Sequence, residues 1–420
     1  METQVPVRNP MVGTAPGHDH LEWASASGVR VHTVDGRELI DFTSGVFVTN
    51  TGHCHPHVVE AIQAQAALLL NCYDAPHPAR AEVAQRLVKL AGPPFDAISL
   101  MTTGAEAIDI AVKAARAYTG RYETLSFANA FHGKTLAALS LSGLPGTRRG
   151  VGPVMPGSIV GFYPTCHTCP LKLTYPECGI ACFDATEEIF KANTTGSLAA
   201  IVVEAYLGAG GAYVAPPEFW PRVRAFADAQ GAVLILDEIQ TGFGRTGTMF
   251  AFEQFGIVPD ILVVAKGMAS GLPMSAAISR HEILESLAPG ILASTYGGNP
   301  LCCAACLATL DVIEDENLPE RARTLGARAL DRMRAWVGQI PGVGDVRGIG
   351  LAFGVELVQA DGRPDPDRAL RVLYSAEREG VVTLPPAGAS NNVVRLAPPL
   401  VISEADLDAG LDALERALRS

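Results

Sequence analysis

The chain has few basic residues and no long apolar run. Only 32 of its 420 residues are lysine or arginine, six of them lysine, and the formal net charge is −12. Binding to a phosphate backbone needs clustered basic side chains, so this balance argues against a nucleic-acid partner. No run of about eighteen apolar residues could span a membrane, and the N-terminus lacks the pattern of a secretory signal. We therefore expect a cytoplasmic protein without a membrane partner.

Cysteine is also too scarce for a disulfide scaffold, with nine residues in this length. Four of the nine nevertheless lie close together, at Cys166, Cys169, Cys178 and Cys182. Two close cysteine pairs could hold a structural zinc, or could remain reduced thiols or local disulfides. The sequence leaves these possibilities open, and we assign no metal ligand.

The composition that is present favours a large folded core, with 48% hydrophobic residues. Short apolar runs alternate with helical patterns, which predicts an α/β fold with a mostly parallel sheet and a smaller α+β domain. We expect an N-terminal segment (1–50) that joins the small domain, a large domain (51–314) and a C-terminal small domain (315–420). The predicted helices are 106–118, 216–230, 301–313 and 404–418. The predicted strands are 97–101, 123–127, 199–205, 232–237, 260–265 and 274–279.

Polar residues at the carboxyl ends of two predicted strands point to the chemistry. Lys266 ends the run ILVVA, and Asp237 ends the run AVLIL. Ligands of open α/β sheets bind beyond the carboxyl ends of the strands. A lysine desolvated there has a lowered pKa and becomes nucleophilic toward an aldehyde. A carboxylate is the partner that the pyridine nitrogen of pyridoxal phosphate (PLP) needs. The pair therefore favours a PLP enzyme.

Two further segments fit a phosphate and a flat ring. Gly104 and Ala105 follow a predicted strand and open a helix, where backbone N–H groups can bind phosphate. Phe131 and His132 follow the next strand, where an aromatic face could stack on a ring. Each segment alone also suits a helix cap or a core aromatic.

A rival function comes from the glycines at 242, 244 and 247, whose spacing matches the dinucleotide-binding pattern. Five residues separate the apolar strand from the first glycine, and TMFAFEQFG follows in place of a small-residue helix face. A nicotinamide-dependent oxidoreductase is therefore only a remote alternative.

Longer strings of the sequence resemble class III aminotransferases of the GABA/ornithine kind. The resemblance rests on TTGAEAIDIAVKAAR, FANAFHGKTLAALSLSG, LDEIQTGFGRTG with the following Lys266, and STYGGNPL. It extends from about Val31 to the C-terminus and implies the fold-type-I PLP architecture.

The resemblance also implies roles for individual residues. Lys266 would form a Schiff base with the cofactor and shuttle the proton, and Asp237 would hold the pyridinium. Thr295 matches a threonine that reaches the phosphate site of a partner subunit, which implies a homodimer. The other implied positions are Gly104 and Ala105 at the phosphate, Phe131 and Ile239 on the ring faces, Gln240 at the phenolic oxygen, and His132 and Glu204 beside them.

The departures from the family bear on the substrate. Relatives that act on ω-amines carry a glutamate that covers a C-terminal arginine, and this chain has Ala209 there. We infer that Arg395 stays available for a substrate carboxylate, which it could bind bidentately. The chain also resembles dialkylglycine decarboxylase, but Val46 replaces the glutamine of that enzyme. Phe47 and Tyr73 are the other expected pocket residues.

The predicted reaction is ping-pong transamination between an amine donor and an oxo acceptor. The segment 163–182 resembles a cysteine-bearing insertion of some amino-acid racemases of the same group. A racemase or epimerase is therefore the alternative, because it needs the same cofactor and proton transfers.

Overall fold

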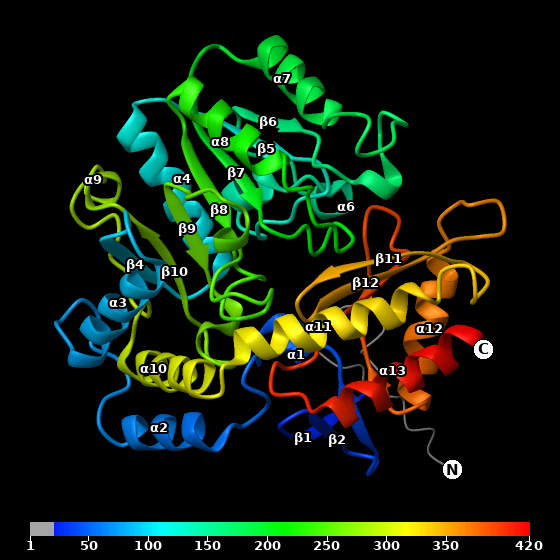
Figure 1. The fold of residues 1–420 in the computed structure, drawn as a ribbon. Coiled ribbons are helices and arrows are strands. Elements are labelled where there is room, and N and C mark those ends of the chain that lie inside the picture. Colours follow the sequence, from blue (N-terminus) through cyan, green and yellow to red (C-terminus); the bar gives the residue numbers. More distant parts are fainter. Residues whose placement is uncertain (1–20) are drawn as a thin grey trace, which may run out of the picture.

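The computed structural model describes residues 21–420, and its largest element is a seven-stranded sheet (Figure 1). Five neighbouring strands are parallel, and β10 runs antiparallel to both of its neighbours. Each of the six predicted strands agrees with an observed strand to within one residue, whereas β6 was not predicted. The order is β4 (Ala97–Met101), β10 (Ser275–Ser279), β9 (Ile261–Val264), β8 (Val233–Asp237), β7 (Leu198–Glu204), β5 (Glu123–Phe127) and β6 (Ser158–Gly161).

Helices cover both faces of this sheet. Val202 and Ile235 belong to one apolar cluster, which includes helix α4 (Gly104–Thr119). Val203 and Leu236, their next neighbours along the strands, belong to the opposite cluster. Successive side chains of a strand point to opposite faces, so a sheet buried on both sides needs continuous apolar runs. This explains the continuous apolar runs of β7, β8 and β9.

Helices α8 (Phe219–Gln230) and α10 (Pro300–Asp315) pack on the second face. The prediction that α8 begins at Pro216 is wrong, because the helix begins three residues later. Pro217 disfavours a helical conformation at Pro216. The other helices are α1 (Ser44–Phe47), α2 (Pro56–Ala66), α3 (Pro78–Ala91), α5 (Leu136–Leu141), α6 (Pro145–Arg148), α7 (Ala181–Asn193), α9 (His281–Leu284), α11 (Leu318–Arg334), α12 (Pro366–Arg378) and α13 (Glu404–Arg419).

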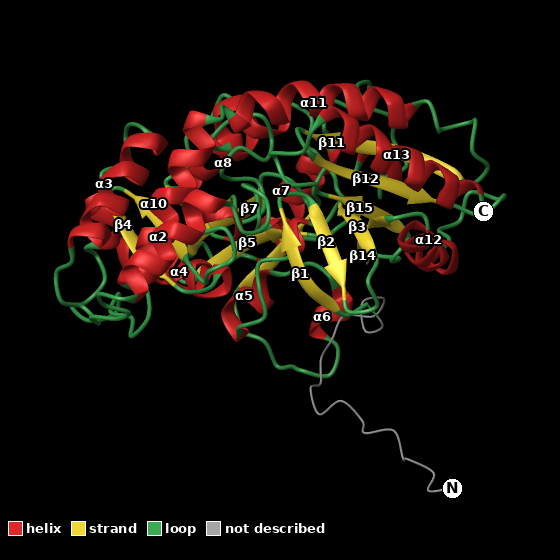
Figure 2. Cartoon of the chain, turned by 90° about the horizontal axis from the view of Figure 1, so that it is seen from below, coloured by secondary structure: helices red, strands yellow, loops and turns green. Residues whose placement is uncertain are grey.

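Two four-stranded sheets form the rest of the molecule (Figure 2). One has the order β11 (Val343–Ile349), β12 (Ala352–Leu357), β15 (Val393–Leu396) and β14 (Leu384–Ala387). The other has the order β1 (Trp23–Ser27), β2 (Arg30–Thr33), β3 (Glu38–Asp41) and β13 (Val381–Val382). β3 pairs in parallel with β13, so the N-terminal strands contact the C-terminal part. The domain boundaries at 50 and 314 stay a prediction.

Arg245 links these parts from the loop after β8. Its side chain is fully buried and donates to the carbonyl oxygens of Leu351 and Pro398. It also donates to the Ser44 hydroxyl at 3.2 Å and to the Asn50 side-chain oxygen at 2.7 Å. One guanidinium therefore joins the large sheet to the N-terminal segment and to the C-terminal part.

None of the helices within residues 21–420 is long and apolar enough to cross a membrane.

Candidate active site

Three strands of the large sheet bring their carboxyl ends to one cavity of about 300 Å³. Glu204, the last residue of β7, is in register with Asp237, the last residue of β8. Lys266 follows the end of β9 by two residues. The predicted site residues that line this cavity are Gly104, Ala105, Phe131, His132, Glu204, Asp237, Ile239, Gln240 and Lys266.

Lys266 has a positive φ angle and an amine with a lowered pKa. Its φ angle is +38°, in the left-handed region that costs a non-glycine residue about 1–3 kcal/mol. Burial lowers the pKa of Lys266 to about 8, and the positive charge of Arg395 acts in the same direction. The carboxylates of Asp237 and Glu204 oppose this effect. The amine is therefore partly neutral near neutral pH, which a nucleophilic lysine requires.

Asp237 is held in place by a buried histidine. His132 Nδ1 lies 2.7 Å from Asp237 Oδ2, and the backbone N–H of Ile239 donates to Asp237 Oδ1 at 3.0 Å. Burial disfavours a charged imidazole, but the hydrogen bond and charge of Asp237 outweigh it and raise the pKa of His132. The contact with His132 orients the Asp237 carboxyl group, which suits a group that pairs with a pyridinium.

Glu204 fixes the chain on two sides of the cavity. Its carboxylate accepts from the backbone N–H of Phe131 at 2.6 Å and from that of Gly208 at 3.2 Å. Burial raises the pKa of Glu204 to about 7, although the charge of His132 opposes this. Glu204 therefore positions the segment that carries the aromatic face of Phe131.

The start of α4 offers backbone donors to an anion. Thr103 and Glu106 form a capping box, in which each side chain accepts from the other residue's backbone N–H. Gly104 and Ala105 lie in the first turn, where N–H groups have no acceptor inside the helix. A Cβ on Gly104 would lie 2.7 Å from Ile239 Cδ1, so glycine lets the helix approach this side chain. The arrangement suits a phosphate.

Gln240 carries a buried polar group without a partner. Within residues 21–420, its Oε1 has no hydrogen-bond partner. A Cβ on Gly208 would lie 1.9 Å from this oxygen, so the amide occupies space that only glycine leaves free. An unpaired buried amide at the cavity wall is a site for a polar ligand atom. The cavity residues together therefore fit PLP, with groups for its aldehyde, ring nitrogen, phenolic oxygen and phosphate.

Arg395, the predicted substrate-binding arginine, lies on β15, is 9% exposed and is not among the residues that line the cavity. Within residues 21–420 its guanidinium makes no hydrogen bond or ion pair, and its buried Nε has no partner. Burial lowers the pKa of Arg395 while the groups of Tyr206 and Glu204 oppose this. Because buried charges are costly unless paired, the arrangement suits an anionic ligand.

Other predicted residues do not line this cavity. Phe47 is 1% exposed and packs behind the cavity against Tyr206. Val46 and Tyr73 are 44% and 53% exposed, and Thr295 is also exposed. Sequence reasoning missed several residues that do line the cavity, because most of them are apolar or small residues in loops, which carry no chemical signal. These are Val48, Thr102, Gly133, Tyr206, Ala265, Gly271, Leu272, Pro273 and Met274.

The glycines of the rival dinucleotide pattern contact protein. A Cβ on Gly244 would lie 3.0 Å from Leu400, and one on Gly247 would lie 3.0 Å from Arg323. No α-helix follows Gly247 directly; turns lead instead to a 3-10 turn at Ala251–Gln254. The segment therefore lacks the helix N-terminus that binds a pyrophosphate.

The four clustered cysteines line one small hollow at the start of α7. They are free thiols, and burial raises the pKa of Cys182 to about 11. In the described part of the chain, the possible metal ligands within 4.8 Å of one another are instead His167, Asp345 and Glu356. Arg347 Nη1 already binds both carboxylates at 2.6 Å. Neither cluster gives us a metal assignment.

Comparisons with known proteins agree with this geometry. A model of the family described as aminotransferase class-III matches residues 14–418. The chain is 38% identical to the 4-aminobutyrate aminotransferase GabT of Escherichia coli, over 93% of this chain and 92% of that one. It is 36% identical to a leucine/methionine racemase of Thermococcus litoralis, over 94% and 89% of the two chains.

A solved structure shares the fold. An amine transaminase from an uncultivated Pseudomonas species, in its PLP-bound form, superposes with a TM-score of 0.91 at 31% identity. The match covers 98% of this chain and 97% of that chain.

Proposed function

The chain belongs to the class-III aminotransferase family and is a PLP-dependent aminotransferase, and from this premise we propose that it transfers the amino group of α-amino acids. The donor would be an amino acid and the acceptor an oxo acid, in two half-reactions that share one cavity. The observation that carries this substrate class is Arg395, a buried guanidinium without a hydrogen-bond or ion-pair partner among residues 21–420.

The bound cofactor supplies an aldehyde and an electron sink for the carbanion. Lys266 would bind this aldehyde and move a proton to and from the substrate carbon, because its lowered pKa of about 8 permits both protonation states. Asp237, held in place by His132, would pair with the ring nitrogen. Gly104 and Ala105 would donate to the phosphate, and Gln240 would contact the phenolic oxygen. Phe131 and Ile239 line the same cavity and would enclose the ring.

Arg395 would bind the substrate carboxylate. A guanidinium that is buried and unpaired in the free protein gains two charge-assisted hydrogen bonds when a carboxylate enters. Ala209 supports this role, because its methyl group cannot neutralise a cation. The Ala209 carbonyl accepts from the backbone N–H of Gly388, which places this loop next to the chain between β14 and β15.

The test compares three primary amines that differ in the position of the carboxylate. The PLP-loaded protein is mixed with L-alanine, β-alanine or isopropylamine without an oxo acceptor, and conversion of the cofactor is followed by absorption. We expect the α-amino acid to react with the highest kcat/KM. Arg395→Met should lower kcat/KM for L-alanine by about a hundredfold, the loss of a charge-assisted pair. Arg363→Met, which changes an exposed arginine, is the matched control.

Two results would contradict the proposal. Faster conversion with β-alanine than with L-alanine would assign the enzyme to ω-amino acids. Exchange of the α-proton in heavy water without conversion of the cofactor would assign it to racemisation or epimerisation.

We also propose a cytoplasmic homodimer with shared active sites. Tyr73 and the apolar run Leu68–Leu70 are exposed and support a covering partner, since single chains rarely leave such side chains in water. Thr295, the residue that the resemblance assigns to the partner's phosphate site, is exposed as well. Sedimentation velocity of the purified protein distinguishes a dimer from a monomer.

A further inference from the structure

Tyr206 is a buried residue of the cavity wall whose hydroxyl is unpaired. It lies two residues beyond the end of β7, is 1% exposed and lines the same cavity as Lys266. Its Oη has no hydrogen-bond partner within residues 21–420. Buried hydroxyls are normally paired, so an unpaired one on a cavity wall indicates a ligand atom.

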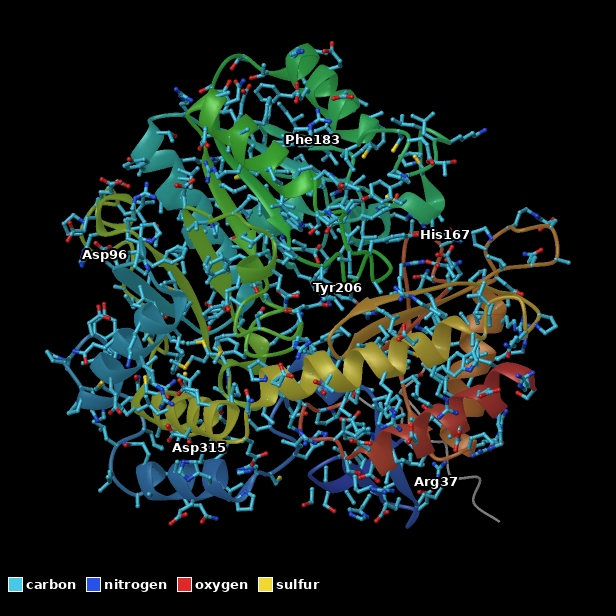
Figure 3. All side chains as sticks on the ribbon, in the orientation of Figure 1. Arg37, Asp96, His167, Phe183, Tyr206 and Asp315 are labelled. Atoms are coloured by element: carbon cyan, nitrogen blue, oxygen red, sulfur yellow. The ribbon has the colours of Figure 1, made fainter. Side chains whose placement is uncertain are left out.

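The ring of Tyr206 packs against apolar side chains, so only its hydroxyl group lacks a partner in the described part of the chain. The ring centroid lies 6.3 Å from that of Phe47. Both belong to an apolar cluster with Ala212, Ala352, Leu384 and Ala397. Figure 3 shows Tyr206 between the large sheet and the strands β11 and β12. The side chain is therefore fixed at the junction where the two parts of the molecule meet.

The same cluster brings Tyr206 to the strand that carries Arg395. Leu384 is the sheet partner of Arg395, and Ala397 follows Arg395 by two residues. Burial raises the pKa of Tyr206, and the positive charge of Arg395 is the strongest opposing influence. The phenol therefore stays protonated and can donate a hydrogen bond.

The charges around the hydroxyl favour an anionic acceptor. After Arg395, the next charges that act on Tyr206 are Arg347 and Arg245, both positive. Arg347 is already paired with Asp345 and Glu356, and Arg245 donates to carbonyl oxygens. Within residues 21–420, the Tyr206 hydroxyl and the whole Arg395 guanidinium have no acceptor, whereas Arg347 and Arg245 each lack an acceptor for one guanidinium nitrogen only.

We propose that Tyr206 donates a hydrogen bond to the substrate carboxylate that Arg395 binds, and that this pair selects α-amino acids over simple amines. The inference rests on the proposed function and adds a second carboxylate-binding group to it. A carboxylate has enough lone pairs to accept from both groups at once.

The test is Tyr206→Phe, which removes the hydroxyl and keeps the ring. The probes are L-alanine and isopropylamine, in which a methyl group replaces the carboxylate. For L-alanine, KM should rise about ten- to hundredfold, as expected for a lost hydrogen bond to a charged group, with little change in kcat. For isopropylamine, both constants should stay within about twofold. Tyr163→Phe is the matched control, because Tyr163 is also buried but does not line the cavity.

A binding measurement keeps the inference testable without turnover. Propionate carries the carboxylate without an amine, and calorimetry of the PLP-loaded protein gives its dissociation constant. Tyr206→Phe should weaken propionate binding by the same factor as L-alanine, whereas Tyr163→Phe should not.

Three outcomes would overturn the inference. An unchanged KM and unchanged propionate binding would show that the hydroxyl does not contact the carboxylate. Equal losses with L-alanine and isopropylamine would assign the hydroxyl to the cofactor or to packing. Failure of the unmodified protein to bind propionate would remove the carboxylate site itself. Failure of that protein to convert the cofactor with any amine would instead contradict the proposed function.

Discussion

The capture of PLP by the cofactor-free protein should depend on pH through Lys266. Only a neutral amine attacks an aldehyde, so the rate constant of capture follows the neutral fraction of this lysine. Burial lowers the pKa of Lys266 to about 8. We expect the rate constant to rise about tenfold per pH unit below pH 8 and to level off above it.

The size of the effect follows from the pKa. The difference between the ordinary value of 10.5 and about 8 corresponds to about 3 kcal/mol. At pH 7, about one lysine in ten is neutral at a pKa of about 8, against about one in three thousand at 10.5. Two substitutions should move the midpoint in opposite directions. Arg395→Met removes a positive charge and should raise the midpoint, and Asp237→Asn removes a negative charge and should lower it, each by about one pH unit.

Stopped-flow absorption between pH 6 and 10 would measure this capture. A parallel series with butylamine corrects for the titration of PLP itself. Lys266→Ala should abolish the fast phase, whereas Lys89→Ala, which changes an exposed lysine of α3, should not.

The reasoning is refuted if the rate constant still rises tenfold per unit at pH 10, because Lys266 would then titrate as an ordinary lysine. It is also refuted if Lys266→Ala retains the fast phase.

Three further perturbations test other parts of the site. Gly208→Ala should lower kcat/KM by about tenfold, because the new Cβ would lie 1.9 Å from Gln240 Oε1. Gly146→Ala is the control, since the space around its Cβ is open. Equal activity of the two variants would argue against a role for Gln240. Arg395→Met should raise the free energy of unfolding of the cofactor-free protein by about 2 kcal/mol in urea, since it removes an unpaired buried charge, and a lower stability would contradict that account. The free energy of unfolding of Lys266→Met should exceed that of the parent protein by about 3 kcal/mol at pH 7. This difference should disappear between pH 8 and 10.5, because in that range the unfolded parent chain binds a proton at Lys266 that the folded chain has lost. A gap independent of pH would show that packing, and not the charge of Lys266, causes it.

The sequence predicted the strands of the large sheet well but not the direction of every strand. Runs such as AVLIL are apolar throughout, and only strands covered on both faces need this composition. The strand in the run MSAAIS is also buried throughout, yet β10 is antiparallel, because hydrophobicity does not encode strand direction. β6 was missed because Ser158–Gly161 is short and lies at the sheet edge, where two of its four residues are only half-buried.

The sequence predicted those site residues that are polar and stand at the carboxyl end of a buried strand. Asp237 and Lys266 stand out because a charged residue interrupts an apolar run at its carboxyl end. Tyr206 gave no such signal, since an aromatic residue between Ala205 and Leu207 resembles ordinary core. Its unpaired hydroxyl, and the isolation of Arg395, depend on side chains from distant segments and become visible only in three dimensions.

The hydrogen bonds of Arg245 have a consequence for motion in the molecule. Its guanidinium is fully buried and donates hydrogen bonds to residues 44 and 50 and to residues 351 and 398. Breaking either set of hydrogen bonds would leave a buried charge without partners, which is costly. These hydrogen bonds connect the two parts of the protein, and a hinge motion that separates the parts would have to break them first. Substrates should enter through adjustments of loops and side chains, and heating should melt the whole described chain in a single calorimetric peak.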